Sequence, residues 1–444
     1  LFIGVMLMLT TRTEMKNLSV RQAFLLTTLS WLILPTFAAL PFTFADLELS
    51  YTDAFFEAMS GITTTGSTVM IGLDYTPPGI LLWRSLLQWL GGVGIVVMAV
   101  SVLPMLQVGG MQLFRMEFAE RMEKALPRAA QIGAWISVIY LVLTLTCAMF
   151  YWLAGMSGFD AVNHAMTTVA TGGFSTHDAS MGASSCPPEQ ELGGGVFIDG
   201  VCHIRTEVLI DGVAQVEETL LLVAGAILTP NTGPMIEAIA TIFMILGSLP
   251  FLLYLQAIRS SIKPLISDSQ VRWFFAILGL AVTSIIVNLI VTQNMAPLEA
   301  IRYASFNITS IMTGTGYAST DYGKWGAFAL ILFYLLMFIG GCAGSTTCGI
   351  KVFRFQVLYE TAKRQMRSLL QPHGVFIAYY NGKPIPYQVM DSVTSFFFLF
   401  AVTFAVLAAA LGLTGQSFIT ATSGAGTALA NVGPGLGELI GPAG

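Results

Sequence analysis

The stretch ITTTGSTV, Ile62–Val69, contains four threonines and a glycine in eight residues. Threonine and glycine both have low helix propensity, and glycine costs about 1 kcal/mol relative to alanine inside a helix. The stretch is therefore a poor piece of membrane helix, although it lies between two long apolar runs. Three further stretches of the same kind occur later in the chain, and together they decide the fold.

An alignment on one glycine relates the four stretches: Gly66, Gly173, Gly316 and Gly433. In every copy the residue six positions before the glycine carries a hydroxyl group, the residue four before is apolar and the residue twelve before is alanine. The three residues just ahead of the glycine are small, or polar and uncharged, with Val432 as the one apolar exception. Agreement at several offsets across four copies predicts an internal repeat.

The composition is that of a membrane protein. Of the 444 residues, 55% are hydrophobic and only 10% are charged, and the mean hydropathy is +0.74; a soluble domain carries about 25% charged residues. Seven runs contain no Asp, Glu, Lys or Arg: 22–45, 85–114, 129–159, 238–258, 273–298, 325–350 and 392–437. Because a helix crosses the hydrocarbon core with about 20 apolar residues, the first six runs predict one crossing each. The last run is long enough for a crossing and more, and residues 1–10 are expected to end a further helix.

Basic residues gather in alternate loops. Sixteen of the 20 Lys and Arg residues lie at 12, 16 and 21, at 115, 121, 124 and 128, at 259, 263 and 272, and at 351, 354, 363, 364, 367 and 383. The positive-inside rule assigns these loops to the cytoplasm. The other connections are acid-rich, with Asp74, Asp160 and Asp178 among their acids. Such an outer face would either concentrate cations or carry ordinary solubilising charge, and the sequence leaves both interpretations open.

An extended Thr/Gly strand presents free carbonyl oxygens. Irregular backbone at membrane depth is tolerated where it is buried in protein or lines a water-filled cavity, and rings of carbonyls can replace the water around a dehydrated cation. Glycine allows the backbone dihedrals that such a strand needs. The alternative is that the small residues are helix-packing surfaces. That alternative suits Gly91-Gly92-Val93-Gly94 better, because those residues lie inside a span.

Each copy of the repeat has the same surroundings: a long span, a segment too short to cross the bilayer, the Thr/Gly stretch, and usually a second long span. The sequence therefore predicts an all-α polytopic membrane protein with four pseudo-repeats of span, re-entrant half-helix, extended filter loop and span around one central pore. The expected parts are an N-terminal helix end and cytoplasmic linker (1–19), pore unit 1 (20–106), pore unit 2 (128–258) with an outer insertion (177–234), pore unit 3 (271–352) with a broken last span, a cytoplasmic basic linker (353–385) and pore unit 4 (386–444), whose last span is missing.

The chain resembles the Trk/Ktr/HKT superfamily of cation transport proteins, and within it the bacterial Trk potassium-uptake membrane subunits. The motifs that carry the resemblance are Ile62-Thr-Thr-Thr-Gly-Ser-Thr68, Val169-Ala-Thr-Gly-Gly-Phe-Ser-Thr176, Ile311-Met-Thr-Gly-Thr-Gly-Tyr317, Ala430-Asn-Val-Gly-Pro-Gly435 and Gly340-Gly-Cys-Ala-Gly-Ser-Thr-Thr-Cys-Gly-Ile-Lys351. The resemblance covers nearly the whole chain, and the motifs are specific as a set in this order.

The resemblance implies a pore formed by four units of one chain, a homodimer in the bacterial inner membrane, and a cytosolic nucleotide-binding regulatory subunit. It also implies one filter glycine in each unit. The filter residues are then Thr64, Thr65, Gly66, Thr171, Gly172, Gly173, Gly314, Thr315, Gly316, Asn431, Val432 and Gly433. In the plant relatives a serine at the first glycine position is associated with sodium passage. Gly66 stands there in this chain, which points to potassium.

A glycine-rich stretch interrupts the last span of unit 3. Its candidate gate residues are Gly340, Gly341, Gly344, Ser345, Thr346, Thr347 and Gly349. The break lies near the cytoplasmic end of the span, just before Lys351, so we expect an intramembrane gate loop beneath the filter. A kink that serves helix packing is the alternative. The amphipathic segment 351–370 that follows could lie on anionic membrane lipid or dock the regulatory subunit.

The predicted function is therefore potassium uptake by selective, gated permeation. Symport with protons or sodium is an alternative, but it usually needs an ionisable group inside the membrane. The seven uncharged runs offer none except His164, which is expected on a half-helix near the outer face. A membrane-embedded enzyme would need a nucleophile, base or metal set, which the scattered Cys and His residues do not form. We expect potassium as the only metal and as the substrate, no covalent cofactor and no nucleic-acid partner. Cys186 and Cys202 share one outer loop and could form a disulfide if that face is oxidising.

Overall fold

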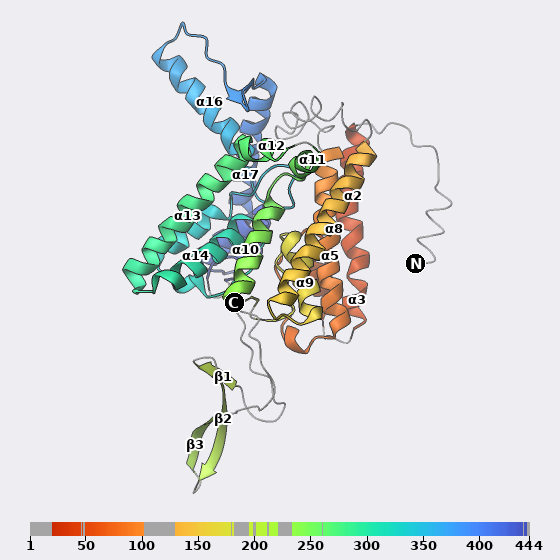
Figure 1. The fold of residues 1–444 in the computed structure, drawn as a ribbon, viewed down its shortest axis with the longest axis vertical. Coiled ribbons are helices and arrows are strands. Elements are labelled where there is room, and N and C mark those ends of the chain that lie inside the picture. Colours follow the sequence, from red (N-terminus) through yellow and green to blue (C-terminus); the bar gives the residue numbers. More distant parts are fainter. Residues whose placement is uncertain are drawn as a thin grey trace, which may run out of the picture.

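The computed structural model describes residues 20–45, 47, 49–101, 129–178, 180–181, 195–198, 201–210, 213–220, 233–259, 261–437 and 439–441. Within these ranges the chain is mostly helical (Figure 1). Five stretches are long and apolar enough to cross a membrane. They are α2 (Val20–Ala38) with α3 (Leu40–Thr43), α5 (Pro78–Ser101), α8 (Ala129–Leu153), α13 (Ser269–Gln293) and α17 (Tyr387–Leu413).

Four shorter helices each follow a long one in the chain: α4 (Tyr51–Ile62), α9 (Gly158–Val169), α14 (Pro297–Met312) and α18 (Phe418–Ala430). They contain 12 to 16 residues, and at about 1.5 Å per residue they are shorter than the hydrocarbon core. All four pack against the long helix before them: α4 on α2, α9 on α8, α14 on α13 and α18 on α17. The half-helices predicted from the sequence are therefore present as helices.

Local capping fixes where these half-helices begin. The side chains of Ser50, Ser157 and Ser417 accept hydrogen bonds from the backbone N–H groups of Asp53, Asp160 and Thr420, at 3.1–3.2 Å. Serine is a preferred residue at this position because it satisfies an N–H that has no partner within the helix. The fourth half-helix, α14, begins instead with a proline, Pro297, which lacks that N–H.

The run 238–258 is not the continuous crossing helix that the sequence predicts. It forms α10 (Pro234–Ser248) and α11 (Phe251–Arg259), which meet at 90°. The cause is Pro250, which has no N–H to continue the helix and forces the residue before it out of helical conformation. Leu249 accordingly adopts extended dihedrals, φ −88° and ψ 155°.

The run 325–350 is also broken, and earlier than expected. Helix α15 (Ala327–Leu336) stops four residues before Gly340, and the chain stays non-helical until α16 (Val352–Leu370) begins. We call residues 337–351 the central loop. The smaller elements are η1 (Leu73–Tyr75), η2 (Tyr322–Lys324), α12 (Lys263–Ser267), and a two-stranded sheet of β4 (Tyr379–Tyr380) and β5 (Lys383–Pro384).

The outer insertion contains an antiparallel sheet of β1 (Gly195–Ile198), β2 (Val201–Ile210) and β3 (Val213–Leu220), in that order. This sheet lies at the opposite end of the molecule from α16 (Figure 1). The predicted disulfide between Cys186 and Cys202 lies outside what the structure describes, because Cys186 and the side chain of Cys202 are not among the described parts.

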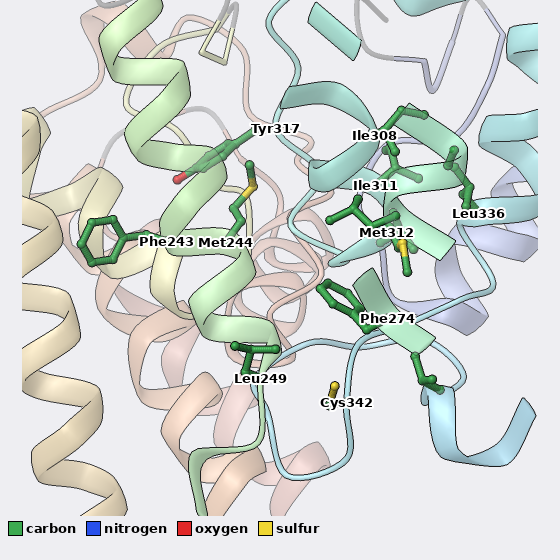
Figure 2. Packing of buried hydrophobic residues seen from close by; sticks show 14 of the residues in the cluster. Phe243, Met244, Leu249, Phe274, Ile308, Ile311, Met312, Tyr317, Leu336 and Cys342 are labelled. Atoms are coloured by element: carbon green, nitrogen blue, oxygen red, sulfur yellow. The ribbon is translucent and has the colours of Figure 1, made fainter. Parts of the chain in front are cut away.

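The largest buried apolar cluster joins α8, α9, α10, α13, α14 and α15. Figure 2 shows Met244 of α10 on the side towards α14, with Phe274 of α13 beneath Met312. Phe243 points the other way, where its ring centre lies 6.2 Å from that of Phe150 on α8. The outer surface is apolar as well. Leu280 and Val291 on α13 and Phe398 on α17 are all more than two thirds exposed. A soluble protein rarely exposes so much apolar surface, whereas lipid would cover it in a membrane.

Candidate functional site

The four half-helices end in the same irregular backbone. The aligned glycines all have positive φ, at 85° for Gly66, 82° for Gly173, 82° for Gly316 and 104° for Gly433. The residues two positions earlier also have positive φ, at 59° for Thr64, 52° for Thr171, 71° for Gly314 and 60° for Asn431. A left-handed conformation is strained for a β-branched residue such as threonine. Strain held at the same offset in several copies indicates a shared structural requirement.

One backbone hydrogen bond closes each half-helix in the same way. The N–H of the residue before the glycine donates to the carbonyl of the hydroxyl residue six positions before the glycine. The four bonds are Thr65 to Ser60, Gly172 to Thr167 and Thr315 to Ser310, each at 2.9 Å, and Val432 to Thr427 at 3.1 Å. This bond repeats in every copy, so the sequence repeat corresponds to a repeat in local structure.

The hydroxyl groups at that position also have a visible role. The hydroxyl groups of Ser60 and Ser310 donate to the carbonyls of Ser67 at 2.5 Å and Tyr317 at 2.6 Å, just beyond the glycine. That of Thr427 donates to Gly433 O at 3.0 Å. Thr167 is the exception, because its hydroxyl bonds the hydroxyl of Tyr317 in the next stretch. These side chains satisfy backbone groups that have no helical partner, which is essential away from water.

The four predicted filter stretches pack against one another in a closed ring. A Cβ on each aligned glycine would strike the carbonyl oxygen of the residue before the next glycine. The pairs are Gly66 with Gly172 O, Gly173 with Thr315 O, Gly316 with Val432 O, and Gly433 with Thr65 O. The last two distances would be 2.5 and 2.7 Å and the first two are shorter still. The contacts run from the first stretch to the second, then to the third and the fourth, and from the fourth back to the first. No side chain fits at any of the four glycines.

A buried ion pair, which the sequence analysis missed, stands beside the first two stretches. Arg84 on α5 and Glu57 on α4 are 1% and 0% exposed, and their Nε and Oε1 atoms are 2.8 Å apart. Glu57 also accepts from the backbone N–H of Val69 at 3.1 Å, and Arg84 donates to Ser175 O at 2.8 Å. The sequence did contain a sign of this pair, since Arg84 stands alone directly before an uncharged run. Lone charges at membrane depth are generally paired and functional.

The central loop is buried and docks into the break between α10 and α11. Cys342 N–H donates to Ser248 O at 3.1 Å, Thr346 N–H donates to Gly247 O at 3.2 Å, and Phe251 N–H donates to Gly344 O at 3.0 Å. Figure 2 shows Cys342 of this loop beside Leu249 at the end of α10. The backbone groups that the helix break leaves without helical partners therefore bond to the loop. The sequence analysis predicted the loop but not this partner.

The same loop contacts the ends of all four half-helices. Thr346 Oγ1 donates to Val169 O at 3.0 Å, and Gly349 N–H donates to Ala430 O at 2.8 Å. Cys348 Sγ accepts from Asn431 Nδ2 at 2.7 Å and lies 3.5 Å from Thr64 Oγ1. A Cβ on Gly314 would lie 3.5 Å from Cys348 Cβ. The predicted gate residues thus lie directly beneath the ring, on the side of the half-helix C-termini.

Acidic residues lie at the other side of the ring, near the half-helix N-termini. Asp74 Oδ1 is 2.6 Å from His177 Nδ1, and Asp160 Oδ1 accepts from Thr176 Oγ1 at 2.8 Å. Asp178 Oδ1 accepts from the N–H of Leu73 at 3.0 Å. These acids hold loops together, which weakens the interpretation of them as free charges that concentrate cations. Within the described ranges, no group of three or more His, Cys, Asp or Glu residues could hold a metal ion.

The chain is similar to known cation transport proteins over most of its length. The protein-family model TrkH, described as a cation transport protein, matches residues 1–185 and 222–442. The Trk system potassium uptake protein TrkI of Halomonas elongata is 42% identical over 423 residues, which are 95% of this chain and 76% of that protein. The Trk system potassium uptake protein TrkH of Vibrio parahaemolyticus is 36% identical, over 99% of this chain and 82% of its own length. The crystal structure of the potassium transporter TrkH from Vibrio parahaemolyticus aligns with a TM-score of 0.80 and 34% identity, over 98% of this chain and 81% of that one.

Proposed function

The chain belongs to the TrkH family of cation transport proteins, and we propose that it conducts potassium ions through a gated pore lined by backbone carbonyls. The family transports ions and is not a family of enzymes, and its Trk members are bacterial inner-membrane proteins. The spans of the described part fit that location. Potassium is accordingly the transported substrate.

The closed ring of glycine and carbonyl contacts carries this proposal. Four stretches with one backbone conformation and one repeated hydrogen bond contact one another in a closed ring, in which each aligned glycine packs against a carbonyl oxygen of another stretch. We infer from this ring that the four stretches surround a common centre. Carbonyl oxygens can replace the hydration shell of a potassium ion. The half-helix C-termini beneath the ring add partial negative charge, which favours a cation. We take the four stretches as the pseudo-symmetric selectivity filter, with pore units at the boundaries predicted above.

The gate in this proposal is the central loop. Its residues from Gly340 to Thr347 are buried, and through Thr346, Cys348 and Gly349 the loop contacts the ends of all four half-helices. A loop in that position obstructs the path of an ion that leaves the filter towards the cytoplasm. It opens the path when it withdraws.

Regulation would reach the gate through α16. The Nζ of Lys351, the last residue before α16, donates to Thr347 O within the loop. A movement of α16 would therefore pull on the loop directly. We propose a cytosolic nucleotide-binding subunit that biases these two states through different contacts in each, on a homodimer of this chain. The relatives' names, which place them in a Trk system, support a multi-component assembly.

Potassium symport is the second candidate, because Glu57 and Arg84 bring ionisable groups beside the filter. Current recording from the purified protein in planar bilayers separates the two candidates. For a channel, a potassium gradient alone drives a current in sodium-free solution, and its reversal potential does not move when a proton gradient is imposed. A reversal potential that moves with the proton gradient, or a current that requires sodium, would overturn the channel proposal in favour of symport.

A further inference from the structure

Helix α5 of the first unit lies against the filter stretch of the second unit. The side-chain amide of Gln88 donates from Nε2 to Gly172 O at 2.6 Å. Its Oε1 accepts from the backbone N–H of Phe174 at 3.0 Å. One fully buried amide therefore bonds the residues on both sides of Gly173. Residues 88 and 172 are far apart in the chain, so sequence periodicity alone gives no sign of this contact.

Arg84 continues the same row of contacts. It lies one helical turn before Gln88, and residues four apart share one face of a helix. One of its guanidinium nitrogens donates to Ser175 O at 2.8 Å, and the guanidinium carbon lies 4.1 Å from the centre of the Phe174 ring. Helix α5 thus contacts the second filter stretch at Gly172, Phe174 and Ser175. Glu57 holds Arg84 in place and also bonds the outer end of the first stretch.

The carbonyl that Gln88 holds belongs to the ring. Gly172 O is the oxygen against which Gly66 packs. In the described part of the chain, no side-chain hydrogen bond reaches the corresponding oxygens of Thr65, Thr315 or Val432. Gln88 also explains why residue 172 is glycine, because a Cβ there would lie 2.5 Å from Gln88 Cδ. The four stretches therefore share one backbone conformation at the ring, but among the described residues Gly172 O is the one ring oxygen that accepts a side-chain hydrogen bond.

We propose that Gln88 and Arg84 are specificity-determining residues that fix the position of the second filter stretch. The inference rests on the filter proposed above and concerns how its width is maintained. A strained backbone persists only where its surroundings over-determine it, and for the second stretch those surroundings include Gln88 and Arg84 of the first unit. Without Gln88 the Gly172 carbonyl can move towards the centre and coordinate the smaller sodium ion. Selectivity should then fall while potassium still passes.

The test is the potassium-over-sodium permeability ratio of three variants in planar bilayers. Gln88→Met removes both hydrogen bonds at similar side-chain length, and we expect the ratio to fall at least fivefold. Gln88→Asn retains an amide that is too short to reach both partners, and we expect a smaller fall. Ser85→Ala is the matched control, because Ser85 is a buried neighbour on α5 whose hydroxyl bonds only its own helix at Leu81 O. It should retain the wild-type ratio.

A second readout covers variants that fold but conduct poorly. In detergent, potassium should raise the unfolding temperature of the wild type more than sodium does, because it binds the folded filter. Gln88→Met should lose that difference and Ser85→Ala should keep it. If Gln88→Met keeps both the difference and the wild-type permeability ratio, the inference is wrong. If the wild type itself shows no potassium preference, the proposed function fails instead.

Discussion

The filter stretches and the central loop are both glycine-rich, non-helical and buried, yet they are held in different ways. Each filter stretch is bonded mainly within its own unit, through the repeated backbone bond and the hydroxyl six residues earlier. The central loop is bonded mainly to other elements, at the α10–α11 break and at the ends of α9 and α18. The second stretch is also bonded by Gln88 and Arg84 of α5. A filter stretch can therefore keep its shape when the loop moves, as long as these supports stay in place. The loop loses several contacts together when one neighbouring element moves.

This difference is what a filter and a gate require. In a filter, the surrounding contacts must hold the strained backbone in one conformation, so that its carbonyl oxygens stay in place. A gate needs two arrangements of similar free energy, with contacts that an external element can break. Glycine content does not distinguish the filter from the gate. The two differ in which elements provide the partners of their backbone hydrogen bonds. The predictions that follow test this contrast, from the largest expected effect to the smallest.

The largest effect is expected from Gly173→Ala. The new Cβ would strike Thr315 O, and φ is +82° at this residue, so the ring cannot close. We expect potassium uptake to be abolished in a rubidium flux assay. The matched control is Gly72→Ala, since Gly72 has φ +75° but open space around its Cβ position. That variant should lose only the roughly 1–2 kcal/mol of left-handed strain and keep its uptake. Equal losses in both variants would show that backbone strain alone is responsible.

The next effect concerns stability. Arg84→Met leaves Glu57 charged and unpaired in a fully buried place, which should cost about 3–5 kcal/mol. Lys324→Met breaks the Lys324–Asp321 pair, whose side chains are 83% and 28% exposed, so water can replace most of that interaction. The denaturant midpoint in detergent should therefore fall much further for Arg84→Met. Combining Arg84→Met with Glu57→Gln should restore part of the loss. A similar fall for both single variants would contradict a special role for the pair beside the filter.

The third prediction addresses the loop. Removing residues 343–347 deletes the bonds from Thr346 to Gly247 O and Val169 O and the bond that Gly344 O accepts from Phe251. If the loop is the gate, potassium flux should rise severalfold and depend less on the regulatory subunit. The permeability ratio should not change, because the ring is untouched. A folded variant with unchanged flux would make the stretch a packing kink, and the gate would have to lie elsewhere.

The sequence predicted the parts of this site that follow local rules. The half-helices and their glycines were visible because a repeat places the same residue types at the same offsets, and the loop was visible because its glycines have low helix propensity. The break at Pro250 was overlooked because a run defined by missing charges says nothing about helix continuity, although proline is a local signal. Gln88, Arg84 and Glu57 were overlooked for a different reason. Their partners are distant in the chain, and a single polar residue in an apolar helix does not indicate what it bonds.

The smallest effect on transport is expected from the contact between the fourth filter stretch and the central loop. Asn431 Nδ2 donates both to Thr63 O at 2.7 Å and to Cys348 Sγ, so one amide joins the fourth half-helix, the first stretch and the loop. Cys348→Ala removes the bond from Asn431 and the 3.5 Å contact with Thr64 Oγ1 but keeps the bond from Asn431 to Thr63 O. We expect about a twofold rise in open probability with unchanged selectivity. Asn431→Gly keeps the left-handed backbone, at φ 60°, without strain. It removes both of these bonds and also the hydrogen bond that Asn431 Oδ1 accepts from Thr65 Oγ1, so open probability should rise and selectivity should also fall.

The double variant decides whether these two residues act through each other. If the bond between them holds the loop, the effects on open probability are not additive, and the double variant should resemble Asn431→Gly alone. Additive effects would mean that Cys348 and Asn431 act separately. A fall in selectivity for Cys348→Ala would break the contrast itself, because a loop contact would then help to shape the filter. The filter would in that case depend on the state of the gate, rather than keep its shape while the gate moves.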